Sequence, residues 1–202
     1  MIFSFYRGWR RYFLPRTLGE FSRYHHKRIS HRFMNRAWTS RPTPILDQFS
    51  LDLTDIARTN KIGFLIGHEV EFNRLINALS RPYKASAILI GEPGVGKESM
   101  VYRLALALVK DEVPEVLLDK RLVKLDLGRV VAGASLGERE DRLTKIVGEI
   151  RSAGNIILYI PNIDNLIKTS GPQYLSAADI LLPSIASNEF SVVGSTYPKE
   201  FR

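Results

Sequence analysis

The sequence contains no cysteine among its 202 residues, which excludes disulfide bonds and thiolate metal sites. Histidine is also scarce, and three of the four (His25, His26 and His31) lie near the N-terminus, so no spacing typical of metal ligands is present. No apolar run approaches the roughly 18 residues of a membrane-spanning helix, and no apolar stretch typical of a secretory signal follows the first charges. We therefore expect neither a spanning helix nor a signal, and the composition is compatible with a reducing compartment.

Acidic residues are nearly absent from residues 1–42, which contain ten Lys and Arg side chains and a single carboxylate, Glu20. This segment carries a net charge of +9 and half of the aromatic residues, whereas residues 43–202 are close to neutral. The run RPTP at residues 41–44 interrupts helical periodicity at the boundary. The composition predicts a basic aromatic arm over residues 1–42 and one domain over residues 43–202.

The arm has several open interpretations. Phe5, Trp9 and Tyr12 recur with helical spacing among arginines, which is typical of a helix lying on an anionic membrane surface. The same pattern suits a helix that is solvated or packed against a partner protein. Arginine with stacking rings can also contact nucleic acid, which we favour less. An Arg-rich start can be a transit peptide, although so many aromatic residues are unusual in one.

Strand-like and helix-like segments alternate along the domain. Apolar runs predict four strands, at residues 87–90, 121–127, 155–160 and 190–194. Helical periodicity predicts helices at residues 51–58, 69–79, 99–107, 138–150 and 177–186, the last interrupted by Pro183. The alternation predicts an α/β fold of three layers, with helices on both faces of a parallel sheet.

The most specific motif is the run GEPGVGK at residues 91–97, between the first strand and the helix that follows it. It has the pattern G-x-x-x-x-G-K of a P-loop, the phosphate-binding loop of many nucleotide-binding proteins. Its glycines let the backbone curl so that several N–H groups point at one anion, and the positive end of the helix dipole faces the same phosphates. Lys97 adds a mobile positive charge. The predicted phosphate-binding residues are Gly91, Gly94, Val95, Gly96 and Lys97.

The residue after this lysine departs from the motif. A P-loop normally continues with Ser or Thr, whose hydroxyl ligates Mg²⁺, but Glu98 occupies this position. Ser99 comes one residue late, which turns its side chain by about 100° around a helix, so we do not expect it to substitute. Two alternatives stay open for Glu98: its carboxylate approaches a metal ion and also repels phosphate, or it turns to solvent and caps the first helical turn. The motif therefore leaves a Mg²⁺ site in doubt.

Segments on both sides of this loop resemble, together with it, the first ATPase module of the Clp-type AAA+ protein unfoldases and disaggregases. The resemblance covers about residues 45–202 and not the arm. It implies a hexameric ring of AAA+ subunits in the cytoplasm, with ATP or ADP at subunit boundaries and a protein substrate threaded through a central pore. The arm could then hold the module at the cytoplasmic face of a membrane. The matching segments are 46–54 (LDQFSLDLT), 91–97, 125–128 (LDLG), 131–134 (VAGA), 154–158 (GNIIL) and 194–196 (GST).

The resemblance also implies contacts with the rest of the nucleotide. Leu65, Ile66 and Gly67 match the segment that packs against adenine, a role that needs only apolar surface and close backbone. The sensor of the γ-phosphate falls at Thr196 or Tyr197, depending on the alignment. Thr196 keeps a hydroxyl group, whereas Tyr197 would be a bulky replacement.

The chain departs from the catalytic pattern of this family. Relatives end the third strand with an Asp–Glu pair that serves Mg²⁺ and the attacking water, but here the pair is Pro161 and Asn162. Losing a general base typically costs about 10²–10⁴ in rate, so we assign no catalytic residue. We expect a surface or capping role for Asp164 rather than a rescue. The pore loop, which matches residues 134–138, lacks its aromatic residue and offers Leu136 instead.

The sequence ends at Arg202, before the fifth strand, arginine finger and helical lid that the resemblance would add, so we expect a fragment of a longer protein. We interpret the chain as a Clp-like ATP-binding module of a protein-remodelling chaperone or protease ATPase subunit, impaired in hydrolysis and regulatory or architectural in role. One alternative is an active ATP-driven unfoldase that uses surrogate catalytic residues. Another is a membrane- or nucleic-acid-binding module with a vestigial nucleotide site.

Overall fold

The computed structural model describes residues 41–59, 67–169 and 176–201. The chain divides into two units, Met1–Trp38 and Thr39–Arg202, and every described residue belongs to the second unit. The membrane, partner and nucleic-acid interpretations of the arm fall outside the described residues and stay predictions.

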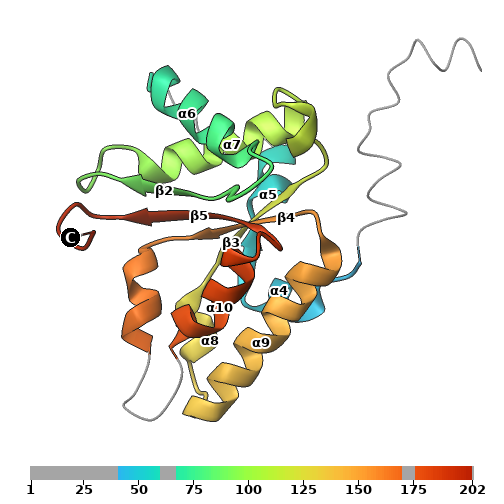
Figure 1. Cartoon of the computed structure of the whole chain (residues 1–202), viewed down its shortest axis with the longest axis vertical. Helices are drawn as coiled ribbons and strands as arrows, with labels where there is room; N and C mark the ends of the chain where they lie inside the picture. Colours follow the sequence, from blue (N-terminus) through green and yellow to red (C-terminus); the bar gives the residue numbers. More distant parts are fainter. Residues whose placement is uncertain (1–40, 60–66, 170–175, 202) are drawn as a thin grey trace, which may run out of the picture. The chain divides into compact units, whose positions relative to one another are not determined.

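A five-stranded sheet forms the middle layer of the second unit, in the order β1-β3-β4-β5-β2 (Figure 1). The four predicted strands are present and parallel. The predicted parallel sheet is thus confirmed for these four strands. The sequence does not predict β1, which adds one antiparallel strand beside β3 at the edge. A strand of three residues is too short to show a period of two. The strands are β1 (Ser50–Asp52), β2 (Ala87–Ile90), β3 (Arg121–Leu125), β4 (Ile156–Ile160) and β5 (Ser191–Thr196).

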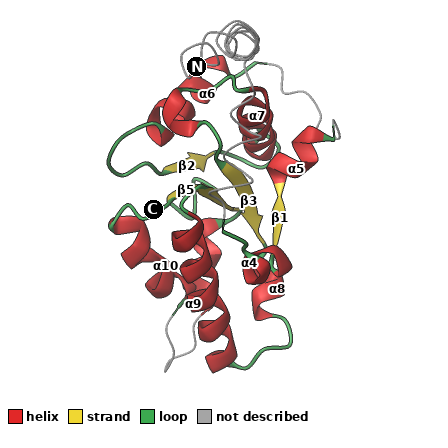
Figure 2. Cartoon of the chain, turned by 90° about the vertical axis from the view of Figure 1, so that its right-hand side faces the viewer, coloured by secondary structure: helices red, strands yellow, loops and turns green. Residues whose placement is uncertain are grey.

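Helices cover both faces of the sheet, which confirms the predicted three layers. In Figure 2, α6 and α7 lie on one side of the strands and α8, α9 and α10 on the other. None of the helices within the described ranges combines the length and apolarity needed to cross a bilayer. The helices are α4 (Pro44–Gln48), α5 (Leu53–Arg58), α6 (Glu69–Leu79), α7 (Lys97–Lys110), α8 (Leu127–Val131), α9 (Leu136–Ala153) and α10 (Ala177–Ala186), with 3₁₀ turns η1 (Glu115–Leu117) and η2 (Ile163–Thr169).

The hydrophobic core consists of two clusters, one on each face of the sheet. Leu122, Ile157 and Tyr159 pack with α5, α6 and α7. Val123 and Leu158 pack with α4, α8, α9 and α10. Successive residues of a strand point to opposite faces, so β3 and β4 contribute to both clusters. This explains why the buried strands appear in the sequence as continuous apolar runs.

Side-chain caps determine where two of the helices begin. Ser135 and Glu138 form a capping box that starts α9 at Leu136, and Ser176 and Asp179 do the same for α10. The predicted start of α9 at Glu138 is therefore two residues late, because hydrophobic periodicity does not register a polar cap.

Pro183 lies inside α10 without ending it, so the predicted interruption is wrong. Proline removes one helical N–H donor and usually breaks a helix interior. Here the carbonyl of Pro183 accepts hydrogen bonds from both the backbone N–H and the hydroxyl of Ser187, at 2.9 and 2.8 Å. These bonds close the last turn of the helix.

One arginine connects the edge strand to neighbouring elements. Arg121 on β3 donates from Nε to Asp52 Oδ2 at 2.9 Å and from Nη2 to Asp47 Oδ1 at 3.1 Å. Its Nη1 donates to Thr43 Oγ1 at 3.0 Å. Although burial opposes the charged form, the contacts with Asp52 and Asp47 raise the pKa of Arg121. This network joins α4, the end of β1 and the start of α5 to β3.

Candidate functional site

Three predicted segments meet at the carboxyl edge of the sheet. Because β2, β4 and β5 are parallel, the residues that follow them lie at the same edge, where α/β sheets bind ligands. These are the P-loop at residues 91–97, then Pro161 and Asn162, and finally Thr196 at the end of β5. The backbone N–H of Gly91 donates to the carbonyl of Thr196 at 3.4 Å. The fold therefore brings together residues that are far apart in the sequence.

The P-loop backbone depends on its glycines. Gly94 and Gly96 have φ angles of +82° and +88°, a region that other residues rarely adopt. A Cβ atom on Gly91 would lie 2.8 Å from Val95 Cγ2. Gly96 is the N-cap of α7, whose first N–H groups have no partner within the helix. The loop thus has the curl and the helix terminus that suit an anion.

Lys97 folds back onto its own loop. Its Nζ donates to the carbonyl oxygens of Gly91 at 2.6 Å and Glu92 at 2.9 Å. The ammonium group also lies 4.5 Å from the centre of the Tyr197 ring, a cation–π contact. Of the two predicted sensor positions, Tyr197 is therefore the one in contact with the P-loop lysine. A phosphate would have to draw the ammonium group away from these partners.

Glu98 on α7 is bonded to a strand of the sheet rather than to its own helix terminus. Its Oε1 accepts from Nζ of Lys124 on β3 and, at 3.2 Å, from the hydroxyl of Tyr102 on α7. The hydrogen bond from Lys124 lowers the pKa of Glu98. The carboxylate of Glu98 pairs with Lys124. In this arrangement it neither faces a metal site nor caps the first turn of α7. Ser99 lies exposed at the next position.

Hydroxyl groups hold the turn that follows β4. Asn162 has a left-handed backbone with φ of +48°, and its N–H donates to Ser195 Oγ at 3.4 Å. Ser195 Oγ lies 3.2 Å from the hydroxyl of Tyr159, and both side chains are buried. Burial raises the pKa of Tyr159. Pro161 and Asn162 line a second pocket, of about 390 Å³, together with Lys124, and neither supplies a carboxylate.

Thr196 contacts the carboxylate of Asp164, for which we expected a surface or capping role. Its buried hydroxyl donates to Oδ1 of Asp164 at 3.2 Å. Asp164 belongs to η2, the turn directly after β4. The structure thus places the carboxylate of Asp164 next to Thr196, one of the two predicted sensor positions. No motif in the sequence signals this contact, because the two residues are 32 positions apart.

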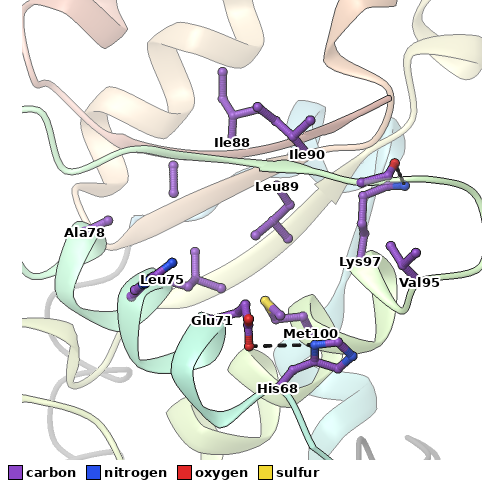
Figure 3. Close-up of a pocket in the computed structure, with 13 residues that line it drawn as sticks. His68, Glu71, Leu75, Ala78, Ile88, Leu89, Ile90, Val95, Lys97 and Met100 are labelled. Carbon is purple, nitrogen blue, oxygen red and sulfur yellow. Dashed lines mark hydrogen bonds and ion pairs between the residues drawn. The ribbon is translucent and has the colours of Figure 1, made fainter. Parts of the chain in front are cut away.

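A pocket of about 550 Å³ opens beside the P-loop, between α6, β2 and the start of α7. Figure 3 shows Leu89 on the same side of β2 as Leu75 and Met100, with Ile88 and Ile90 on the other side. The polar side chains that line this pocket include His68, Glu71 and Arg74 and, at the P-loop end, Lys97. The part of the lining that comes from α6 was not predicted from the sequence, because that helix carries no recognisable motif.

The segment expected at adenine is only partly described. Leu65 and Ile66 lie outside the described residues, and their role stays a prediction. The carbonyl of Gly67 accepts from Arg103 Nη1 at 3.3 Å, and the same guanidinium pairs with Glu69 at 2.6 Å. Arg103 on α7 thereby holds the residues before α6 close to the helix that begins at the P-loop.

The Mg²⁺ ion that accompanies nucleotides in many P-loop proteins does not fit the residues present here. The Ser or Thr position of the motif is Glu98, whose carboxylate is bonded to Lys124 and Tyr102. Among residues 41–59, 67–169 and 176–201, no three His, Cys, Asp or Glu side chains form a group suited to a metal ion. We therefore derive no step through Mg²⁺.

The expected pore-loop position is the start of a helix. Ser135 caps α9, and Leu136 is its first residue and half-buried. The hydroxyl of Ser135 accepts from the N–H of Glu138 at 3.4 Å. The bonds between Ser135 and Glu138 lower the pKa of Glu138, an exposed carboxyl group. A contact between Leu136 and a substrate stays a prediction.

Comparisons with known proteins agree with this geometry. The ATPase family associated with various cellular activities (AAA) matches residues 87–197. The negative regulator of genetic competence ClpC/MecB of Bacillus subtilis is 46% identical over 162 residues, which are 79% of this chain and 20% of that protein. The chaperone protein ClpB of Oceanobacillus iheyensis is 47% identical with the same coverage. The chain thus spans about a fifth of the length of these curated relatives.

Solved structures of Hsp104 have a similar fold. The Saccharomyces cerevisiae Hsp104–ADP complex superposes with a TM-score of 0.70 at 34% identity, over 78% of this chain and 22% of that one. The closed state of Hsp104 with ATPγS and FITC casein gives a TM-score of 0.71 at 34% identity, over 78% and 28% of the two chains. The sheet, the P-loop and these matches together show that the chain belongs to the AAA family of ATPases, as a Clp-type module related to ClpC, ClpB and Hsp104.

Proposed function

We propose that this chain is a Clp-type module that binds ATP or ADP and hydrolyses ATP slowly or not at all. One observation at the carboxyl edge carries the proposal. The P-loop and Lys97 have the form of a phosphate site, whereas Pro161 and Asn162 follow β4, where the resemblance predicts the catalytic pair. At the same edge, Glu98 is bonded to Lys124 instead of facing a metal site.

In this proposal the phosphates lie against the P-loop and the first turn of α7, where N–H groups and the helix dipole favour anions. The nucleoside then occupies the pocket of about 550 Å³ beside the loop, whose walls are mostly aliphatic. A pocket of this size suits a small ligand. One of the similar Hsp104 structures is a complex with ADP, which supports a nucleotide as the ligand.

We further propose a regulatory or architectural role within a hexameric ring of AAA+ subunits in the cytoplasm. A module that binds nucleotide without turning it over can complete a ring and stabilise it by mass action. One of the similar Hsp104 structures is a complex with casein, which supports a protein substrate for the assembly. Residues 1–42, with ten basic side chains, would place the assembly near an anionic membrane surface.

The central test is steady-state phosphate release by the full chain with Mg-ATP, alongside nucleotide titration. We expect saturable binding but phosphate release no faster than that of the Lys97→Ala variant, because no general base stands at position 162 and its absence costs about 10²–10⁴ in rate. Rapid release that Lys97→Ala abolishes would contradict the proposal.

A second candidate, an active ATPase with a surrogate base, is favoured by the contact between Asp164 and Thr196. If Asp164 takes the proton of the attacking water, Asp164→Asn abolishes any turnover that the wild-type chain shows. Asp141→Asn, the same change at an exposed position of α9, is the matched control and should leave turnover unchanged. Equal loss in both variants would count against a specific role for Asp164.

The ring of Tyr197 competes with nucleotide for Lys97. A cation–π contact at an exposed site contributes about 0.5–1 kcal/mol, and it stabilises the position in which Lys97 bonds its own loop. Tyr197→Leu should therefore tighten nucleotide binding about two- to fivefold in a fluorescence titration, whereas Tyr197→Phe keeps the ring and the wild-type affinity. Weaker binding by Tyr197→Leu would show that the ring contacts the bound nucleotide instead.

A further inference from the structure

At the position where related P-loops have a metal-ligating hydroxyl, this chain has a carboxylate that is paired with a lysine. We propose that the ammonium group of Lys124 neutralises Glu98 beside the P-loop, so that this module binds a nucleoside polyphosphate without Mg²⁺. The inference rests on the proposed nucleotide binding and assigns Lys124 a role that no motif indicates.

The position of Lys124 follows from the fold. It lies on β3 in register with Tyr159 of β4, and Tyr159 belongs to the cluster that packs against α7. From this face its Nζ reaches Oε1 of Glu98, which follows the P-loop lysine directly in sequence. Both partners are only partly exposed, with 27% of the Lys124 side chain and 49% of the Glu98 side chain accessible.

The orientation of Glu98 is held from two sides. The hydroxyl of Tyr102, one turn later on α7, donates to the same carboxylate oxygen at 3.2 Å. Although burial opposes the charged form, the bond to Glu98 raises the pKa of Lys124, and the bond from Lys124 lowers the pKa of Glu98. The pair is therefore ionised at neutral pH. A divalent ion that approached the Glu98 carboxylate would have to displace the ammonium group of Lys124.

Electrostatics explains why this pairing matters for an anionic ligand. A free carboxylate in the first turn of α7 would repel phosphates at the very place where the helix dipole attracts them. Lys124 cancels that charge. The attraction of Lys97 and of the P-loop N–H groups then acts without opposition, and added Mg²⁺ finds the Glu98 carboxylate already paired.

A charge cycle tests this assignment, using a fluorescent ADP analogue and the full chain in EDTA and in Mg²⁺. For the wild type we expect the same dissociation constant in both buffers, within about twofold. In EDTA, Lys124→Met should weaken binding about fivefold because it exposes the Glu98 charge, and Glu98→Gln should tighten binding because it frees the Lys124 charge. The double variant Glu98→Gln/Lys124→Met should recover most of the loss.

The outcomes separate this inference from the proposed function. Binding by the wild type that Mg²⁺ tightens more than about tenfold overturns the role of Lys124 and leaves nucleotide binding intact. Equal affinities across the charge cycle overturn it as well. If the wild type binds no ADP analogue in either buffer, the proposed function fails and the inference fails with it. Glu98→Gln keeps the size of the side chain and removes its charge, so its tightening remains a valid test even if Lys124→Met does not fold.

Discussion

Lys97→Ala is expected to weaken the binding of ATP and ADP by about 10- to 100-fold. A hydrogen bond to a charged group contributes about 1.5–3 kcal/mol, and Lys97 is the P-loop side chain positioned to make such bonds with phosphate. Part of the effect is offset, because the ammonium group already bonds the carbonyls of Gly91 and Glu92 and would have to leave them. Isothermal titration calorimetry with ADP measures the change directly.

The matched control is Lys110→Ala, which removes an exposed lysine from the last turn of the same helix. This variant should bind with wild-type affinity, since it lies at the opposite end of α7. An unchanged affinity in Lys97→Ala would mean that the P-loop does not hold phosphate, and the proposed function would then have to be abandoned.

The second large effect concerns the helix that carries the P-loop. Leu104 on α7 is fully buried among α5, α6 and the sheet. Leu104→Ala should lower the free energy of unfolding by about 2–5 kcal/mol, because it removes apolar contacts and leaves a cavity. Urea denaturation followed by circular dichroism gives this value from the shift in midpoint.

Leu182→Ala provides the comparison, since 57% of Leu182 on α10 is exposed and surface changes usually stay within about 0.5 kcal/mol. Replacing a buried leucine by alanine typically lowers the free energy of unfolding by about 2–5 kcal/mol. If Leu104→Ala lowers it by less than about 1 kcal/mol, the core cluster does not hold α7 as described above. The folded fraction of Leu104→Ala should still bind nucleotide, because Leu104 lies about two turns away from the P-loop.

Periodicity and turn chemistry predict most of the fold from the sequence. α6 and β2 have the predicted bounds. The apolar positions of α6 repeat with helical spacing, β2 is one short apolar run, and both are bounded by polar or glycine-rich residues. The sequence misses β1 and places the start of α9 too late. β1 is stabilised by its pairing with β3, and the start of α9 depends on a polar cap. Neither strand pairing nor a polar helix cap produces a periodic pattern of apolar residues in the sequence.

The candidate site divides in the same way. The P-loop is a continuous run, so its residues and the departure at Glu98 can be identified along the chain. The resemblance likewise predicts the departures at Pro161 and Asn162 from the sequence. The partners of these residues cannot be identified in this way. Lys124 is 26 positions from Glu98, and no local rule connects a strand lysine to the first turn of a helix that precedes it.

Residue identity alone therefore identifies a P-loop and the concentration of charge in the first 42 residues, and it predicts that the metal and base positions of the family are replaced. Folding decided which charges meet: Lys124 with Glu98, Asp164 with Thr196, and Lys97 with the Tyr197 ring. The reason is physical. Local sequence governs backbone curl and helix starts, whereas the neighbours of a side chain depend on strand order and on which face of the sheet each residue occupies.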